Sequence, residues 1–252
     1  MSNYQRNTSM IVCIFAVIVV GAIVVGFISY YGTNTWNWNL NPPTTDFAFE
    51  AEVGTTNETV TLDVDLSAGA VNVIFVDNTS LLYDIDIRVL NTTLEDDGAP
   101  VVTFTSNTIR LDYTAAGVNI TLGSGVNYTI NIHTTTGGVG LELSDGAHVG
   151  DVTVLVTTGA IALDMTDGVI LLGNSTFDLQ TSTGGIDINV DLPSGIGASV
   201  ECALTTGSID ISATGWTQIT PNHYETSNYD TASQTLTVIA ETTIGSIEAI
   251  FT

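Results

Sequence analysis

Residues able to do acid–base or nucleophilic chemistry are few and widely separated in this 252-residue chain. The histidines are His133, His148 and His223, and none of them belongs to a His-x-x-x-His or His/Cys pattern of a metal site. No Gly-x-Ser-x-Gly sequence is present to hold a serine nucleophile on a strand-to-helix turn. We therefore expect structural or surface histidines and predict that the protein is not an enzyme. A hydrolase of the cell envelope is the minor alternative.

Acidic residues recur at one position of a repeated pattern. Asp187, Asp210 and Glu248 each follow an isoleucine and occupy the same outward position in different repeats. Stacked strands lie about 4.8 Å apart, so these carboxylates are expected to form a ladder. The ladder is either a weak Ca²⁺ site, since hard cations prefer oxygen ligands, or a solvated stripe that keeps the protein soluble. Residues 95–98, Glu-Asp-Asp-Gly, lack the ligand spacing of a calcium loop and predict a turn. No other cofactor or metal is expected.

Aromatic residues gather in a segment that interrupts the pattern, between Gly215 and Ser233. Aromatic side chains in a polar loop on a rigid scaffold often bind a partner, so Trp216, Tyr224 and Tyr229 are candidate contacts for a surface protein or a glycan. In the alternative interpretation, Trp216 covers an open end of the core.

Composition excludes one class of partner. Three basic residues oppose 27 acidic ones, and the formal net charge of −24 repels nucleic acid.

Cys202 alternates with Val200 and Leu204, so we expect a buried, inert thiol that does not pair with Cys13.

The element that positions these residues is a short repeat. An alternating strand ends at Thr-Thr or Ser-Thr, glycine supplies a positive φ for a turn, and a second alternating strand leaves. A degenerate copy closes the chain at residues 242–247 and an earlier one opens the domain at residues 67–73. Because one unit cannot bury its apolar face alone, the sequence predicts an all-β, β-solenoid-like stack of short two-strand repeats over residues 59–252. The regular copies are Thr135–Val139, Thr157–Ile161, Ser182–Ile186 and Thr205–Ile209.

Longer strands are expected between the opening copy and the regular repeats. They cover Leu82–Leu90, Val101–Ser106 and Thr108–Thr114, with a hairpin turn at Ser106-Asn107, and would cap one end of the stack. No window after residue 60 carries helical periodicity.

The N-terminal region predicts a membrane anchor. Residues 10–31 contain no charge and are long enough to cross a bilayer as a helix, which is retained or, alternatively, cleaved as a signal. Arg6 makes residues 1–9 a short cytoplasmic tail, so the C-terminal domain lies outside a single-pass cell-membrane protein. Residues 32–58, with Pro42 and Pro43, are expected to be an extracytoplasmic stalk or linker.

Six Asn-x-Ser/Thr sequences agree with an exported glycoprotein. These candidate glycosylation sites are Asn57, Asn78, Asn91, Asn119, Asn127 and Asn174.

The opening Gly-x-Val-x-Val strand followed by Thr/Ser-Thr-Gly-x-Ile-x-Ile units over about residues 60–212 resembles the putative adhesin family of bacterial and archaeal surface proteins, with its toastrack-type stacked β fold. The resemblance implies a displayed binding domain and carries no catalytic residue. Together with the anchor, it favours an adhesin-like or scaffolding domain of the cell surface that binds membrane lipid through its N-terminal helix. The alternative function is a self-associating subunit of a surface filament or lattice.

Overall fold

The computed structural model describes residues 42–55, 58–144 and 146–252. The predicted tail, the predicted span at residues 10–31 and the first part of the linker lie outside these residues. Within the described residues, no helix has the length and apolar character needed to cross a membrane.

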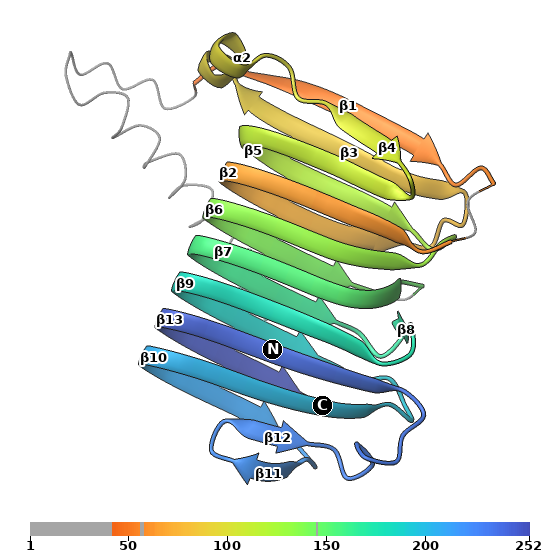
Figure 1. The fold of residues 1–252 in the computed structure, drawn as a ribbon, viewed down its shortest axis with the longest axis vertical. Coiled ribbons are helices and arrows are strands. Elements are labelled where there is room, and N and C mark those ends of the chain that lie inside the picture. Colours follow the sequence, from red (N-terminus) through yellow and green to blue (C-terminus); the bar gives the residue numbers. More distant parts are fainter. Residues whose placement is uncertain (1–41, 56–57, 145) are drawn as a thin grey trace, which may run out of the picture.

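The described chain is almost entirely β, as predicted, and its strands form one sheet (Figure 1). The bounds of its elements are β1 Thr44–Glu52, β2 Val60–Val76, β3 Leu81–Leu90, α2 Asn91–Asp97, β4 Val102–Thr105, β5 Thr108–Gly123, β6 Tyr128–Leu143, β7 His148–Met165, β8 Ile170–Leu171, β9 Ser175–Val190, β10 Gly197–Ala213, β11 Thr217–Thr220, β12 His223–Glu225 and β13 Thr235–Phe251.

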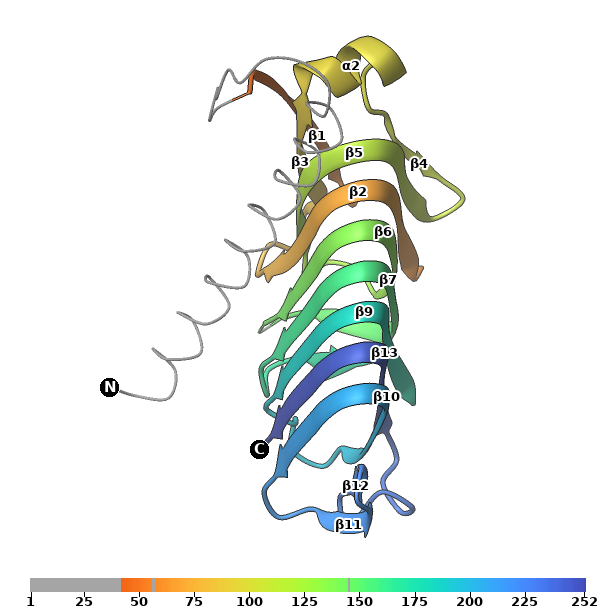
Figure 2. The ribbon, with the colours of Figure 1, turned by 90° about the vertical axis from the view of Figure 1, so that its left-hand side faces the viewer.

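Each repeat is a single bent strand rather than two strands joined by a turn. The long strands contain 16 to 18 residues, and their pairing continues on both sides of the Thr-Gly motif. Figure 2 looks onto these bends, where the strands arch over the molecule one above another. The predicted repeat unit is therefore correct in position, but the glycine bends the strand without ending it.

A ladder of glycines makes the bends possible. Gly159 has a φ of 149°, and a Cβ there would lie 1.5 Å from the carbonyl oxygen of Gly137 on the neighbouring strand. Only a residue without a side chain fits such an approach. The ladder ends at β5, where Ala116 lies opposite Gly69. Its members, in spatial order, are Gly69, Gly137, Gly159, Gly184, Gly245 and Gly207.

Each bent strand contributes to two layers, which Figure 1 shows joined at the bends. In β7, Val152 and Val154 before the bend and Ile161 and Leu163 after it are all buried in one apolar cluster. The alternation of strand side chains thus places every second residue of both halves in the interior. The predicted continuous core is confirmed.

The order of strands in the sheet differs from their order in the chain. The sequence of neighbours is β1-β3-β5-β2-β6-β7-β9-β13-β10-β12-β11. The C-terminal strand β13 is inserted between β9 and β10, and β2 lies between β5 and β6, in both cases with parallel pairing. The repeats are therefore stacked neighbours, as predicted, but not always successive ones.

Antiparallel elements lie at the two ends of the stack. The β4–β5 hairpin turns at Ser106 and Asn107, whose φ values of 50° and 59° confirm the predicted turn. At the same end, β1 pairs with β3 and β3 pairs with β5. At the other end, the β11–β12 hairpin pairs with β10 at residues 199–201.

Two predictions made from the sequence, for residues 44–52 and 95–98, were wrong. Residues 44–52, placed in the linker 32–58, form strand β1, because Phe47, Phe49 and Ala51 occupy alternate positions of the strand and pack against the core. The acidic run expected to be a turn lies mostly within the short helix α2, which ends at Gly98 with a φ of 78°. The folded domain therefore begins near residue 44 rather than 59.

Candidate binding groove

A groove of about 580 Å³ crosses six strands on the outer face of the layer formed by the second strand halves. It extends from Asp46 on β1 through β3, β5, β2 and β6 to Asp164 on β7. These strands come from distant parts of the chain, and the sheet order alone brings them together.

Small residues make the hollow. Along one row of the sheet, Asn119, Asn72, Gly140 and Ala162 are register neighbours on β5, β2, β6 and β7. The next strand, β9, carries Asp187 at the equivalent position. Where the outward residue is glycine or alanine, the backbone itself becomes the floor, and larger side chains on either side become the rim.

The groove is acidic. Arg88 donates a hydrogen bond of 2.8 Å from Nε to Oδ1 of Asp46 and approaches Oδ2 with Nη2 at 3.5 Å. This contact lowers the pKa of the Asp46 carboxyl and neutralises its charge. Among the described residues, Asp86, Glu142 and Asp164 have no such cationic partner. The side chains of Asn72 and Asn119 make no hydrogen bond to the described residues either, so the groove presents polar groups ready for a ligand.

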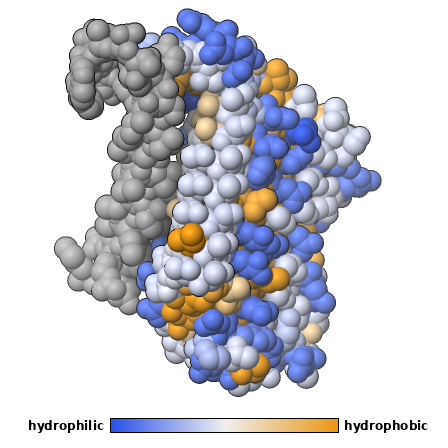
Figure 3. Space-filling model, turned by 60° about the vertical axis from the view of Figure 1, so that its left-hand side comes forward, coloured by the Kyte–Doolittle hydropathy of each residue, from blue (hydrophilic) through white to orange (hydrophobic). Residues whose placement is uncertain are grey.

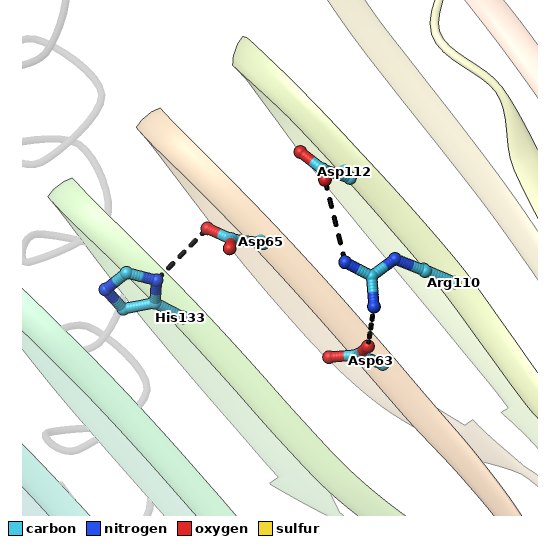
Figure 4. Close-up of polar contacts among 5 residues, drawn as sticks. All are labelled: Asp63, Asp65, Arg110, Asp112 and His133. Atoms are coloured by element: carbon cyan, nitrogen blue, oxygen red, sulfur yellow. Dashed lines mark hydrogen bonds and ion pairs between the residues drawn. The ribbon is translucent and has the colours of Figure 1, made fainter.

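The outer face of the first strand halves carries a different charge cluster, shown in Figure 4. Arg110 contacts Asp63 at 2.8 Å and Asp112 at 3.6 Å, and His133 Nδ1 lies 3.1 Å from Asp65. Here one arginine and one histidine are interspersed among three aspartates. His133 is thus a surface residue with a carboxylate neighbour, as expected from the sequence.

The predicted acidic ladder exists, but in a different order. Glu248 lies between Asp187 and Asp210, because β13 is inserted between β9 and β10. Burial raises the pKa of Asp187, and Glu248 and Asp164 raise it further. In the described residues, no group of three or more potential ligands is arranged to hold a metal ion. The Ca²⁺ alternative stays a prediction without a ligand cluster to support it.

The three aromatic candidates lie near the end of the stack formed by β10 and its hairpin. Trp216 packs on Phe251 with 4.9 Å between ring centroids, and Tyr224 on β12 packs against the core. The Tyr229 hydroxyl lies 3.0 Å from Thr237 Oγ1. These half-buried positions agree with the alternative in which Trp216 covers the open end, and a role in ligand contact stays a prediction.

One serine, one histidine and one carboxylate meet beside this hairpin. Ser199 Oγ and Glu225 Oε1 both lie 3.0 Å from Nε2 of His223. In a catalytic triad, the serine and the carboxylate bond opposite nitrogens of the ring, so that the acid orients the base. Both contacts fall on the same nitrogen here, and this arrangement does not relay a proton. His148, at the start of β7, is half-buried.

Cys202 is a buried free thiol, and burial raises its pKa to about 12. The thiolate needed for nucleophilic chemistry is therefore scarce at neutral pH, in agreement with the inert thiol expected from the sequence. Cys13 lies outside the described residues.

The candidate glycosylation sites fall into different environments. Asn78 and Asn174 are exposed, and Asn119 lies in the groove. Asn91 accepts a hydrogen bond from Thr45, and Asn127 is half-buried. Asn57 lies outside the described residues. Glycosylation of any of them stays a prediction.

The groove residues were missed by the sequence interpretation. Asp46 had been placed in the linker, and Arg88, Asn72 and Glu142 belong to strands whose neighbours the repeat pattern does not reveal. A usable signal was present, since Gly140 and Ala162 replace the acidic residue at the outward position of the repeat. Small residues at that position leave a hollow in any stack.

Comparisons with known proteins give the fold a context. The family model described as "Cell wall-active antibiotics response LiaF, C-terminal" matches residues 145–249, less than half of the chain. A crystal structure of a putative cell adhesion protein from Clostridium sporogenes is similar over 83% of this chain and 100% of its own, with a TM-score of 0.67 and 16% identity. A putative adhesin from Bacteroides fragilis is matched over 83% of this chain and 98% of its own. Its TM-score of 0.32 and 9% identity are too low to show a shared fold. No curated protein matches the chain in sequence.

These similarities agree with the fold of stacked, bent strands described above. The Clostridium sporogenes protein shares the fold over its own full length, and the LiaF-like match covers the last three of the four regular repeats and the closing copy. The predicted resemblance to the putative adhesin family, with its stacked β repeats, is thus confirmed at the level of the fold.

Proposed function

We propose that the chain is an adhesin-like binding module of a bacterial or archaeal cell surface, without catalytic activity, and that the groove is its ligand-binding surface. The observation that carries this proposal is the polar groove across six strands of a rigid stack. Asp46 is paired with Arg88 and Asp164 accepts a hydrogen bond from Asn189, but Asp86, Glu142 and the two asparagines have no hydrogen-bond partner among the described residues, which suits recognition of a ligand.

The sequence supports the topology in this proposal. The apolar residues 10–31 would anchor the chain in the membrane, and the residues that follow would hold the domain away from the headgroups. The groove would then face the extracellular medium. Alkaline extraction of membranes and protease treatment of intact cells test this arrangement, since a retained anchor keeps the chain in the pellet and an exposed domain is digested.

A groove-filling variant tests the binding function directly. Gly117 lines the groove, and an added Cβ would meet no atom within 4 Å, so Gly117→Trp fills the hollow without straining the backbone. Gly185→Trp is the matched control, because Gly185 lies on β9 outside the groove and its Cβ would meet only ordinary contacts. The full chain in neutral detergent is screened against whole cells, surface proteins and glycans. Binding that Gly117→Trp abolishes and Gly185→Trp preserves supports the proposal, whereas binding that neither variant changes assigns it to another surface.

A filament or lattice subunit is the second candidate. The layer of second strand halves ends in β1 on one side and in the second half of β10 on the other, and neither edge pairs with another described strand. Free edges at opposite ends of one sheet permit head-to-tail association. Electron microscopy of the purified chain and of native envelopes distinguishes the candidates, because ordered polymers would replace the first proposal.

A further inference from the structure

We propose that the groove binds an extended basic peptide segment, with lysine or arginine side chains paired to carboxylates toward its two ends and the peptide backbone held by the asparagines between them. This inference rests on the proposed function, because it names the ligand class of the same groove.

Acidic side chains outnumber basic ones in the groove. Five ionisable side chains line the groove, and four of them are carboxylates. Arg88 pairs with Asp46 and also interacts electrostatically with Asp86, whereas Glu142 and Asp164 have no ion pair among the described residues. The opposite outer face, by contrast, contains its own arginine and histidine partners. The groove therefore carries an excess of negative charge, which attracts cations.

The wide spacing of these carboxylates suits an extended peptide ligand better than a single metal ion. The described carboxylates are not gathered into a group that could hold a metal. Asp86 lies on β3. Glu142 lies on β6, three strand steps from β3, and Asp164 lies on β7, four strand steps from β3. At about 4.8 Å per step, these steps correspond to roughly 14 and 19 Å. An extended peptide covers about 3.3 Å per residue, so its two basic side chains would be about four to six residues apart.

The centre of the groove fits a peptide backbone. Asn119 and Asn72 are register neighbours on β5 and β2, between the two acidic ends. A carboxamide both donates and accepts hydrogen bonds, as a peptide group does. Next to them, Gly140 and Ala162 leave room for a main chain to approach the floor. A polyamine has the charges for this groove but no peptide groups for the amides.

The experiment uses the full chain in neutral detergent and a labelled peptide with two lysines separated by four glycine and serine residues. Fluorescence anisotropy is expected to show binding that weakens about tenfold or more when both lysines become glutamine, and again when salt is raised from 20 to about 300 mM. The competitor is a linear oligo(ethylene glycol) diamine, which has two ammonium groups at a similar separation but no peptide groups, and it is expected to bind more weakly than the peptide. Equal or stronger binding of this diamine overturns the assignment to a peptide.

Matched variants separate the groove from the general negative charge. Asp86→Asn with Glu142→Gln is expected to weaken peptide binding about tenfold, while Glu201→Gln with Glu241→Gln, on the other outer face, changes it less than twofold. Asn72→Ala with Asn119→Ala is expected to weaken it as well. Equal losses in the groove and control pairs, or no binding at all, overturn the inference. Cell or glycan binding that is sensitive to Gly117→Trp, without peptide binding, would leave the proposed function standing and remove only this ligand class.

Discussion

The ladder glycines carry more constraint than any other residues of the repeat. Gly184 has a φ of 149°, and a Cβ there would lie 1.5 Å from the carbonyl oxygen of Gly159. The positive φ and the overlap of an added Cβ with the neighbouring carbonyl oxygen therefore both exclude a side chain at position 184. The next residue, Gly185, has no positive φ, and its added Cβ would lie 3.6 Å from Ser246 Oγ.

We expect Gly184→Ala to destabilise the protein by at least about 3 kcal/mol, because the bend must open or the neighbouring strand must move. Gly185→Ala is expected to change the free energy of unfolding by less than about 1 kcal/mol. Denaturant titration followed by circular dichroism measures both. Similar losses in the two variants would contradict a role for the ladder.

Asp187 gives a prediction for pH. Burial, Glu248 and Asp164 raise its pKa in the folded state above the ordinary value of 3.8, so its ionised form destabilises the fold. This penalty is complete above the folded pKa and disappears as the pH falls through that value toward 3.8. We therefore expect Asp187→Asn to raise the Tm at pH 7.

Thermal unfolding at several pH values checks this expectation. The advantage of Asp187→Asn should shrink toward zero near pH 3, where the wild-type carboxyl is protonated as well. Asp210→Asn is the control, since Asp210 belongs to the same row but is exposed on the edge strand. An advantage that does not change with pH would contradict the electrostatic cause.

At the scale of elements, the insertion of β13 between β9 and β10 determines which strand is interior. Ile247 on β13 is 1% exposed, whereas its register neighbour Ile209 on β10 is half-buried at the edge. The two residues occupy the same position of the repeat. Their environments differ only because one strand has neighbours on both sides.

Alanine substitution should reveal this difference. We expect Ile247→Ala to cost about 3 kcal/mol and Ile209→Ala about 1 kcal/mol, because the cavity left at the edge is open to solvent and fills with water. Denaturant unfolding of the two variants measures the costs, and amide exchange should find β13 as protected as β7. A larger cost at Ile209 would mean that β10, and not β13, is the interior strand in solution.

The whole molecule carries a formal charge of −24 with three basic residues. Self-repulsion of this size opposes compaction and is screened over about 8 Å at physiological ionic strength. We expect the Tm to rise as sodium chloride increases from 10 to about 300 mM, and differential scanning calorimetry checks this directly. A Tm that falls with salt would indicate that ion pairs, such as Arg88 with Asp46, outweigh the repulsion.

Much of the architecture could be predicted from local sequence, and the errors have identifiable causes. The repeated Thr-Gly motif located the bends, and Ser106-Asn107 located a hairpin, because both depend on backbone conformations of one or two residues. Strand β1 was overlooked because Pro42 and Pro43 suggested a stalk, although Phe47 and Phe49 already lie two residues apart, flanked by Asp46 and Glu50. The groove was not predicted because its residues are spread over more than a hundred positions.

Local sequence is sufficient to establish that the chain is all-β, that its direction changes at the Thr-Gly motifs and that alternate side chains form one core, since these properties follow from local geometry and from the two-residue period of a strand. The folded stack, in contrast, establishes that β2 and β13 pair with strands distant in the chain, that Glu248 separates Asp187 from Asp210, and that six strands build one acidic groove. The physical reason is that repeats of nearly equal length present nearly equivalent backbone edges. Their order in the sheet is therefore decided by the packing of the complete stack.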